Sequence, residues 1–201
     1  VAGLLSLSMA AVLLGGCGSS TEKEDDAKTD QETTSVDDIP GKKFAIIIRN
    51  AGNPYAEKEA EGFQKVIEAE GGECIVKAPE AATADAQVSL IQSLISQEVD
   101  SIAIASNDVN ALSAALEEAM DAGIKVSSLD SNVAPDVRQT FVNQAGTEEI
   151  GQALADAVLD ISGGEGQFAI LSASSQAANQ NAWIASMEAI MKDEKYAKLA
   201  L

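Results

Sequence analysis

The stretch Phe44-Ala45-Ile46-Ile47-Ile48-Arg49-Asn50-Ala51-Gly52-Asn53-Pro54 decides the fold of this chain. Its first five residues form an unbroken apolar run, which is typical of a strand buried on both faces of a parallel sheet. A polar turn follows, and Pro54 stands where a helix can begin, because its fixed φ suits the first helical turn. Apolar residues at helical spacing continue to Ile67, and Gly71-Gly72 ends the predicted helix.

Strand and helix alternate in the same way along the rest of the chain, at a spacing near thirty residues. Such alternation with short turns predicts right-handed crossovers and a sheet covered on both faces. We therefore predict an α/β fold with a doubly wound, mostly parallel sheet. Further strands are predicted at residues 73–77, 101–105, 124–129, 138–142 and 167–171, and further helices around residues 88–95, 109–120, 150–161 and 177–191.

The amino-terminal forty residues have a different character. The apolar residues 1–14 match the length of a signal-peptide core and are too few to span a bilayer. They end in Leu14-Gly15-Gly16-Cys17, which resembles the bacterial lipobox, so we expect export and lipidation of Cys17. A buried core helix is the alternative. Residues 18–41 are mostly acidic and polar, which predicts a disordered tether.

Both ends of the chain suggest a fragment. No Met and no basic n-region precede the apolar run, which indicates a missing start or a non-standard start codon. Residues 42–201 suffice for one compact domain and part of another. We expect a first lobe over residues 42–144 and an incomplete second lobe over residues 145–201.

Composition excludes several classes of function. The net charge of −19 argues against nucleic acid and against anionic lipid head groups as partners. The chain has no histidine, which removes the commonest general base and the commonest zinc ligand. Its two cysteines cannot form a disulfide framework, and Cys74, in an apolar segment, is expected to be a buried free thiol. We predict no cofactor, no metal and no enzymatic activity.

Polar side chains follow three of the predicted strands, at the edge where open parallel sheets bind ligands. They are Arg49 and Asn50, residues 106–108, and residues 130–132. Asp, Asn and Arg can form paired hydrogen bonds with neighbouring hydroxyls, so a polyhydroxylated small molecule is the expected ligand. Asn107 and Asp108 could instead cap the helix that follows them. For Asp130, which no helix follows directly, ligand contact is favoured over capping.

The order of these segments resembles that of the type 1 periplasmic binding proteins, the sugar-binding subunits of ABC importers. The segments are the lipobox, the acidic tether, residues 49–55, Asn107-Asp108, residues 129–132 and residues 142–144. Residues 172–184 look more like the branch that binds rhamnose or the furanosyl autoinducer. The resemblance covers residues 42 to about 195 and implies two α/β lobes that enclose a sugar.

The resemblance also implies roles for particular residues. Arg49 and Asp130 match ligand-contacting positions after the first and fourth strands. Asn179 and Gln180 match a pair that reaches the ligand from the second lobe. Three further residues are expected in or near the pocket: Asn53, Tyr55 and Trp183. Ribose-binding relatives carry a second aromatic where this chain has Ala56, which weakens the case for ring stacking, and Trp183 could instead pack inside its helix.

We therefore expect the extracytoplasmic, lipid-anchored substrate-binding component of a carbohydrate ABC importer. It would be a monomer that binds a monosaccharide such as rhamnose and delivers it to membrane permease subunits. A sensor that presents the sugar or autoinducer to a membrane receptor is the alternative. A sugar-responsive repressor would need a basic helix-turn-helix where this chain has its apolar run and acidic tether.

Overall fold

The computed structural model describes residues 39–201 of the chain. The predicted signal and lipobox at residues 1–17, with the lipidation of Cys17, and most of the predicted tether at residues 18–41 lie outside the described residues. Within residues 39–201, no helix combines the length and the apolar character that crossing a membrane requires.

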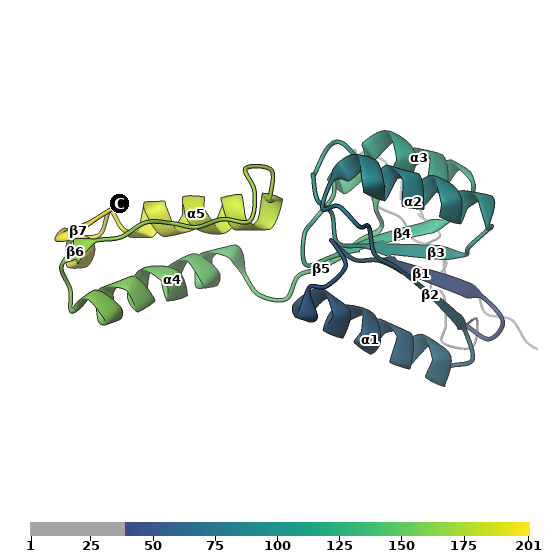
Figure 1. The fold of residues 1–201 in the computed structure, drawn as a ribbon, viewed down its shortest axis with the longest axis horizontal. Helices are drawn as coiled ribbons and strands as arrows, with labels where there is room; N and C mark the ends of the chain where they lie inside the picture. Colours follow the sequence, from purple (N-terminus) through teal and green to yellow (C-terminus); the bar gives the residue numbers. More distant parts are fainter. Residues whose placement is uncertain (1–38) are drawn as a thin grey trace, which may run out of the picture. The chain divides into compact units, whose positions relative to one another are not determined.

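The main sheet is built from five parallel strands, β1 (Lys43–Ile47), β2 (Glu73–Lys77), β3 (Ser101–Ile104), β4 (Lys125–Leu129) and β5 (Thr140–Val142). Their order is β2-β1-β3-β4-β5, and every neighbouring pair is parallel (Figure 1). From β1 the chain first winds to one side, to β2, and then crosses to the other side for β3, β4 and β5. The predicted α/β class and the doubly wound parallel sheet are therefore confirmed.

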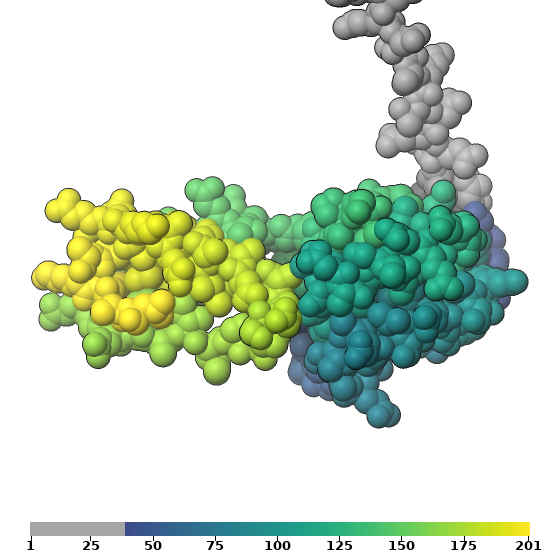
Figure 2. Space-filling view, turned by 90° about the horizontal axis from the view of Figure 1, so that it is seen from above, coloured from purple at the N-terminus to yellow at the C-terminus, as the bar shows by residue number. Residues whose placement is uncertain are grey.

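Three helices cover this sheet, α1 (Pro54–Ala69), α2 (Ala84–Ser96) and α3 (Ser113–Asp121). Helix α1 lies on one face, and α2 and α3 lie together on the other (Figure 1). Figure 2 looks onto the second face, where the side chains of α2 and α3 lie against each other. Neighbouring residues of β1 alternate between the faces: Ile46 packs towards α1, and Ile47 joins the cluster under α2 and α3. Burial on both faces explains why the strands read as continuous apolar runs.

Beyond the sheet the chain forms α4 (Thr147–Ser162), α5 (Ala178–Ile190) and two short paired strands, β6 (Gly166–Gln167) and β7 (Leu199–Ala200). Helices α4 and α5 touch closely at Gly151. A Cβ atom there would lie 2.4 Å from Ser186 Oγ and 2.9 Å from the backbone nitrogen of Met187, so only glycine fits. The two helices therefore pack backbone to backbone at this point.

A polar cluster joins α4 to the segment before β7. The Tyr196 hydroxyl donates to Asp156 Oδ1 over 2.6 Å, and Lys195 Nζ donates to the same oxygen over 2.9 Å. Gln152 Nε2 donates to Asp156 and to the Tyr196 hydroxyl. These hydrogen bonds and the Lys195 charge hold the pKa of Asp156 down, at about 2. The ring of Tyr196 is buried against Ala155 and Met187, and its hydroxyl is held by the polar cluster.

Three sequence predictions need correction. The strand expected at residues 167–171 pairs only through Gly166–Gln167, since the residues after it have no neighbouring strand. The third helix begins at Ser113 and not near residue 109, because residues 109–112 form turns first. Cys74 is a free thiol, as expected, but it is half-buried, since its strand is the edge of the sheet. Burial raises the pKa of this thiol.

Candidate functional site

The carboxyl ends of β1 and β3 lie side by side at the point where the winding of the sheet reverses, which is the usual ligand site of such folds. Arg49 follows β1, and Asn107 follows β3. Arg49 Nε donates to Asn107 Oδ1 over 3.3 Å, and Asn107 Nδ2 donates to the Arg49 carbonyl over 2.8 Å. The two side chains therefore hold each other in place at the predicted edge.

Asp130 lies at the end of β4 and is 8% exposed. Its φ is +54°, a left-handed conformation that non-glycine residues seldom adopt and that is often found at functional sites. The Gln144 side chain donates to Asp130 Oδ1 over 2.9 Å. Burial raises the pKa of the Asp130 carboxyl, and Arg49 and the neighbouring amides oppose that rise. A partly buried acceptor of this kind suits a hydroxyl group of a ligand.

Asn179 joins the two charged residues of the site. Its Oδ1 accepts from Arg49 Nη1 over 3.2 Å, and its Nδ2 donates to Asp130 Oδ1 over 3.2 Å. Residues far apart in the sequence, after β1, after β4 and at the start of α5, thus share one hydrogen-bonded cluster. The structure brings together three of the residues that the resemblance implicated.

A cavity of about 460 Å³ opens beside this cluster. Most of the residues that line it have polar side chains, so we call it the polar cavity. Its volume falls in the range of small-molecule sites. Eight of the nine predicted ligand-binding residues line it: Arg49, Asn53, Tyr55, Asn107, Asp130, Asn179, Gln180 and Trp183. Lining a cavity is a placement, and their contact with a ligand stays a prediction.

Asp108 is the predicted residue that the cavity does not include. Its Oδ1 accepts from the backbone N–H groups of Asn110 and Ala111, both over 2.9 Å. The carboxylate therefore caps the turn that leads to α3, which is the second of the two roles that the sequence left open. Asn107 lines the cavity, and its contact with a ligand stays a prediction.

The loop between β1 and α1 contributes in two ways. Asn53 caps α1, because its Oδ1 accepts from the backbone N–H groups of Tyr55 and Ala56. The cap uses the side-chain oxygen of Asn53, so the side-chain NH₂ group stays available as a donor at the cavity. Tyr55 is 52% exposed, so its ring forms part of the rim and is not packed in the core.

Gln180 and Trp183 line both this cavity and a second one. Gln180 Oε1 accepts from Ser172 Oγ over 2.8 Å and from the Ala173 N–H over 2.7 Å. These bonds hold the 172–173 segment against the start of α5. Trp183 is half-buried between the two cavities, so both roles considered for it, pocket lining and packing, have support.

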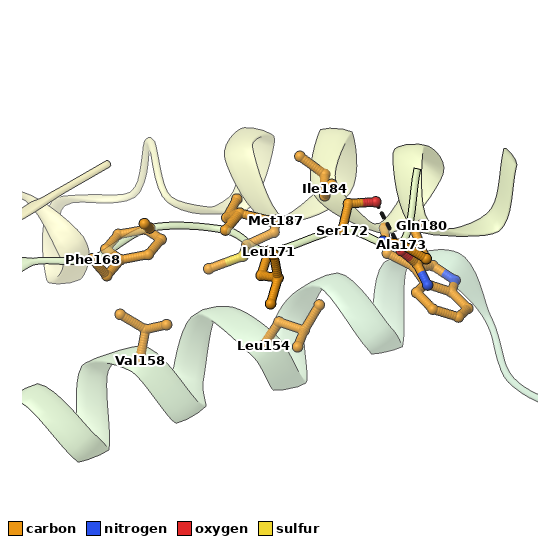
Figure 3. Close-up of a pocket in the computed structure, with 12 residues that line it drawn as sticks. Leu154, Val158, Phe168, Leu171, Ser172, Ala173, Gln180, Ile184 and Met187 are labelled. Atoms are coloured by element: carbon orange, nitrogen blue, oxygen red, sulfur yellow. Dashed lines mark hydrogen bonds between the residues drawn. The ribbon is translucent and has the colours of Figure 1, made fainter. Parts of the chain in front are cut away.

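The second cavity, of about 640 Å³, is mainly apolar. Figure 3 shows Phe168, Leu171 and Met187 facing Val158 and Leu154 of α4. The Ser172–Gln180 hydrogen bond closes one end of it (Figure 3). Walls with so few hydrogen-bonding groups suit apolar side chains and not a polyhydroxylated ligand. The polar cavity is therefore the candidate ligand site.

Glu59 is a residue of the site region that the sequence reasoning missed. It lies one helical turn after Tyr55, and its Oε2 is buried without a hydrogen-bond partner among the described residues. Burial, first, and then the charge of Asp130 raise the pKa of Glu59 to about 7, although Tyr55 and Arg49 act against the rise. The i, i+4 spacing from Tyr55 is the signal that could have revealed it.

Two amides were also missed as site residues. Gln144 contacts Asp130, as described above, and follows the shortest strand of the main sheet. Gln87 is fully buried on α2, on the same face as Ile91 and Leu94. A polar residue inside an apolar helical stripe was the available signal. Among residues 39–201, no group of three or more acidic or cysteine side chains could hold a metal ion.

Comparison with known proteins agrees with the geometry. The family model described as periplasmic binding protein domain matches residues 44–201. An ABC transporter solute-binding protein from Clostridium phytofermentas, solved with bound L-rhamnose, is 56% identical, with a TM-score of 0.79 over 80% of this chain and 50% of that one. A sugar ABC transporter structure from Actinomyces odontolyticus is 35% identical, with a TM-score of 0.63 over 80% and 52% of the two chains.

A third similar structure is LsrB from Clostridium saccharobutylicum in complex with AI-2. It is 29% identical, with a TM-score of 0.71 over 78% of this chain and 50% of that one. The chain therefore spans about half the length of the structures that it matches.

Proposed function

This chain belongs to the periplasmic binding protein family, and from that membership we propose that it is the substrate-binding component of a carbohydrate ABC importer. The family binds its ligands without catalysis, so the chain is not an enzyme. The proposed ligand is a monosaccharide such as L-rhamnose, which would be bound reversibly. Similarity to the rhamnose-bound protein, at 56% identity, supports this choice of sugar.

One observation carries the proposal: Arg49, Asn179 and Asp130 form a continuous donor and acceptor series beside the polar cavity. Each sugar hydroxyl can donate one hydrogen bond and accept others, so such a series can bind neighbouring hydroxyls in pairs. The exposed ring of Tyr55 and the indole of Trp183 add flat apolar surfaces for the C–H side of a sugar.

The domain organisation is part of the proposal. Residues 42–144 would form the first lobe, and residues 145–201 would begin the second. The site supports this division, because Arg49 and Asp130 follow strands of the main sheet and Asn179 belongs to α5. Closure of two lobes would enclose the sugar and present the complex to the permease.

We also propose an extracytoplasmic location, with the lipid-modified Cys17 as the anchor and residues 18–41 as the tether. The support is the order of the sequence, with an apolar run, small residues, a cysteine and an acidic segment. Globomycin treatment of cells would test it, since a lipoprotein accumulates as the uncleaved precursor. Normal processing of a Cys17→Ser variant would contradict the anchor.

The ligand is tested by calorimetric titration of the full-length protein with L-rhamnose, ribose, galactose, xylose and the furanosyl autoinducer. We expect saturable binding of L-rhamnose. Tighter binding of the autoinducer would favour a second candidate, a role in autoinducer capture, which the similarity to LsrB in complex with AI-2 supports. A folded protein that binds no sugar would refute the proposal.

Asp130→Asn tests the site, with Asp108→Asn as the matched control. Both changes remove one negative charge after a strand of the same sheet, but only Asp130 lines the cavity. We expect Asp130→Asn to weaken binding by about 10- to 100-fold, the loss of one charge-assisted hydrogen bond. Asp108→Asn keeps the capping oxygen and should leave affinity unchanged. Equal effects of the two changes would show that the assigned pocket is wrong.

A further inference from the structure

Gln87 is the only fully buried amide side chain among residues 39–201, and it contacts the backbone of Asn107, which lines the polar cavity. It belongs to the first turn of α2, which begins after the capping residue Thr83. Its Nε2 donates to the carbonyl of Ala105 over 2.8 Å and approaches the carbonyl of Ile48 at 3.5 Å. One side chain thus spans the ends of β1 and β3, where the winding of the sheet reverses.

The other end of the same amide fixes the backbone of the site. Gln87 Oε1 accepts from the Asn107 N–H over 2.8 Å. Asn107 in turn holds Arg49 through a reciprocal pair of hydrogen bonds. Each polar group of Gln87 is therefore used inside the protein, and Gln87 does not line the cavity.

An apolar residue would be the ordinary choice at this position, since Gln87, Ile91 and Leu94 share the buried face of α2. Burial of an amide is tolerated only when its hydrogen bonds are made. The strand ends gain a cross-link that an apolar side chain could not supply. The cross-link also continues to Asn107, which in turn contacts Arg49.

We propose that Gln87 is a positioning residue of the sugar site, which sets the Asn107–Arg49 pair without touching the ligand. The inference rests on the proposed function, because the pair matters only if the cavity takes a sugar. Loss of the amide would let the ends of β1 and β3 shift, and the donors of Arg49 would then meet a ligand hydroxyl in poorer geometry.

The test compares Gln87→Met with the wild type in the full-length protein. Met has nearly the same length and volume but cannot donate a hydrogen bond. In the ligand-free protein, we expect the Nε–Hε signal of Arg49 and the side-chain amide signals of Asn107 to move in ¹H–¹⁵N spectra. With L-rhamnose as the probe, we expect affinity to fall about tenfold, the equivalent of about 1.4 kcal/mol.

Ile91→Val and Ile91→Ala are the controls, since Ile91 is equally buried one turn further along α2 and touches no site residue through a hydrogen bond. They should lower the melting temperature and leave both the spectra of the site and the affinity unchanged. Gln87→Leu, which also lacks the donor and has a similar volume, is the second variant if Gln87→Met does not fold. It should move the same signals and weaken binding to a similar extent.

Unchanged Arg49 and Asn107 signals in a folded Gln87 variant would overturn the inference, as would equal losses of affinity in the Ile91 controls. The spectra are recorded without sugar, so they judge Gln87 independently of the ligand. A wild type that binds no sugar would refute the proposed function while displaced signals would still support the positioning role.

Discussion

Glu59 should make the folded protein lose stability as the pH rises through neutrality. Its pKa is about 7 in the folded state against an ordinary value of 4.5, mainly because of burial and the charge of Asp130. Between these two pH values the folded state binds more protons than the unfolded state. The free energy of unfolding must therefore decrease as pH increases across this window.

The magnitude follows from the difference between the two pKa values. At 1.36 kcal/mol for each pKa unit, the difference between about 7 and 4.5 corresponds to about 3.4 kcal/mol of unfolding free energy. Glu59 keeps part of its surface in water, so solvent screening reduces the effect, and we expect about 1–2 kcal/mol. Glu59→Gln removes the titration and should flatten the decline by that amount.

The assay is urea unfolding of the ligand-free full-length protein at pH 5 and pH 8. Glu61→Gln is the matched control, because Glu61 lies on the same helix in an exposed ion pair with Lys58. Burial raises the pKa of Asp130 in the same direction, but Asp130 is present in all three proteins. Identical pH dependence in the wild type and Glu59→Gln would refute the reasoning.

Three further predictions concern stability and ionisation. Gly151→Ala should destabilise the protein by about 1–3 kcal/mol in thermal unfolding, because a Cβ atom there meets the backbone of α5. Gly62→Ala in α1 is the control, since its Cβ atom meets open space, and it should stabilise by up to about 1 kcal/mol. Equal effects of the two changes would contradict the close helix contact. Tyr196→Phe should raise the pKa of Asp156 from about 2 towards its ordinary 3.8, as followed by carboxyl NMR, because the largest cause of the depression is the tyrosine hydroxyl. The stability linked to ionised Asp156 is present above about pH 4 and is lost as the pH falls towards 2, so Tyr196→Phe should lose less unfolding free energy than the wild type over this range. Asn53→Ala should cost about 1 kcal/mol in urea unfolding through loss of the helix cap, and Asn53→Ser should restore most of it; no difference between the two would show that the cap does not stabilise α1.

The sheet could be predicted from the sequence because burial on both faces leaves a direct record in the residues. Ile46 and Ile47 point to opposite faces, and both had to be apolar. The same signal was misleading at residues 167–171. Phe168 and Ile170 pack against the cluster of α4 and α5, but Leu171 is exposed, and beyond Gln167 the segment has no neighbouring strand. An apolar run alone therefore does not establish that a partner strand is present.

The two aspartates after strands show the limit for site residues. Asp108 and Asp130 look alike in the sequence. In the structure, Asp108 accepts hydrogen bonds from the backbone N–H groups of the residues two and three positions after it. Asp130 instead has a left-handed backbone conformation and accepts from the Gln144 side chain. Only the backbone separates a capping role from a site role. Local patterns mark Glu59, one helical turn after Tyr55, and Gln87, inside an apolar helical stripe. Their contacts across the fold, with Asp130 and with the ends of β1 and β3, could not be predicted from those patterns.

Asn179 has a consequence for the energetics of binding. Its amide accepts from Arg49 and donates to Asp130, which is the same pair of roles that a sugar hydroxyl can play. A ligand hydroxyl that binds Arg49 and Asp130 must therefore replace the hydrogen bonds that these two residues already make with the Asn179 amide. Under the proposed function, affinity for the sugar would then reflect the difference between two satisfied networks. Asn179→Ala would remove the internal competitor together with a residue that lines the cavity.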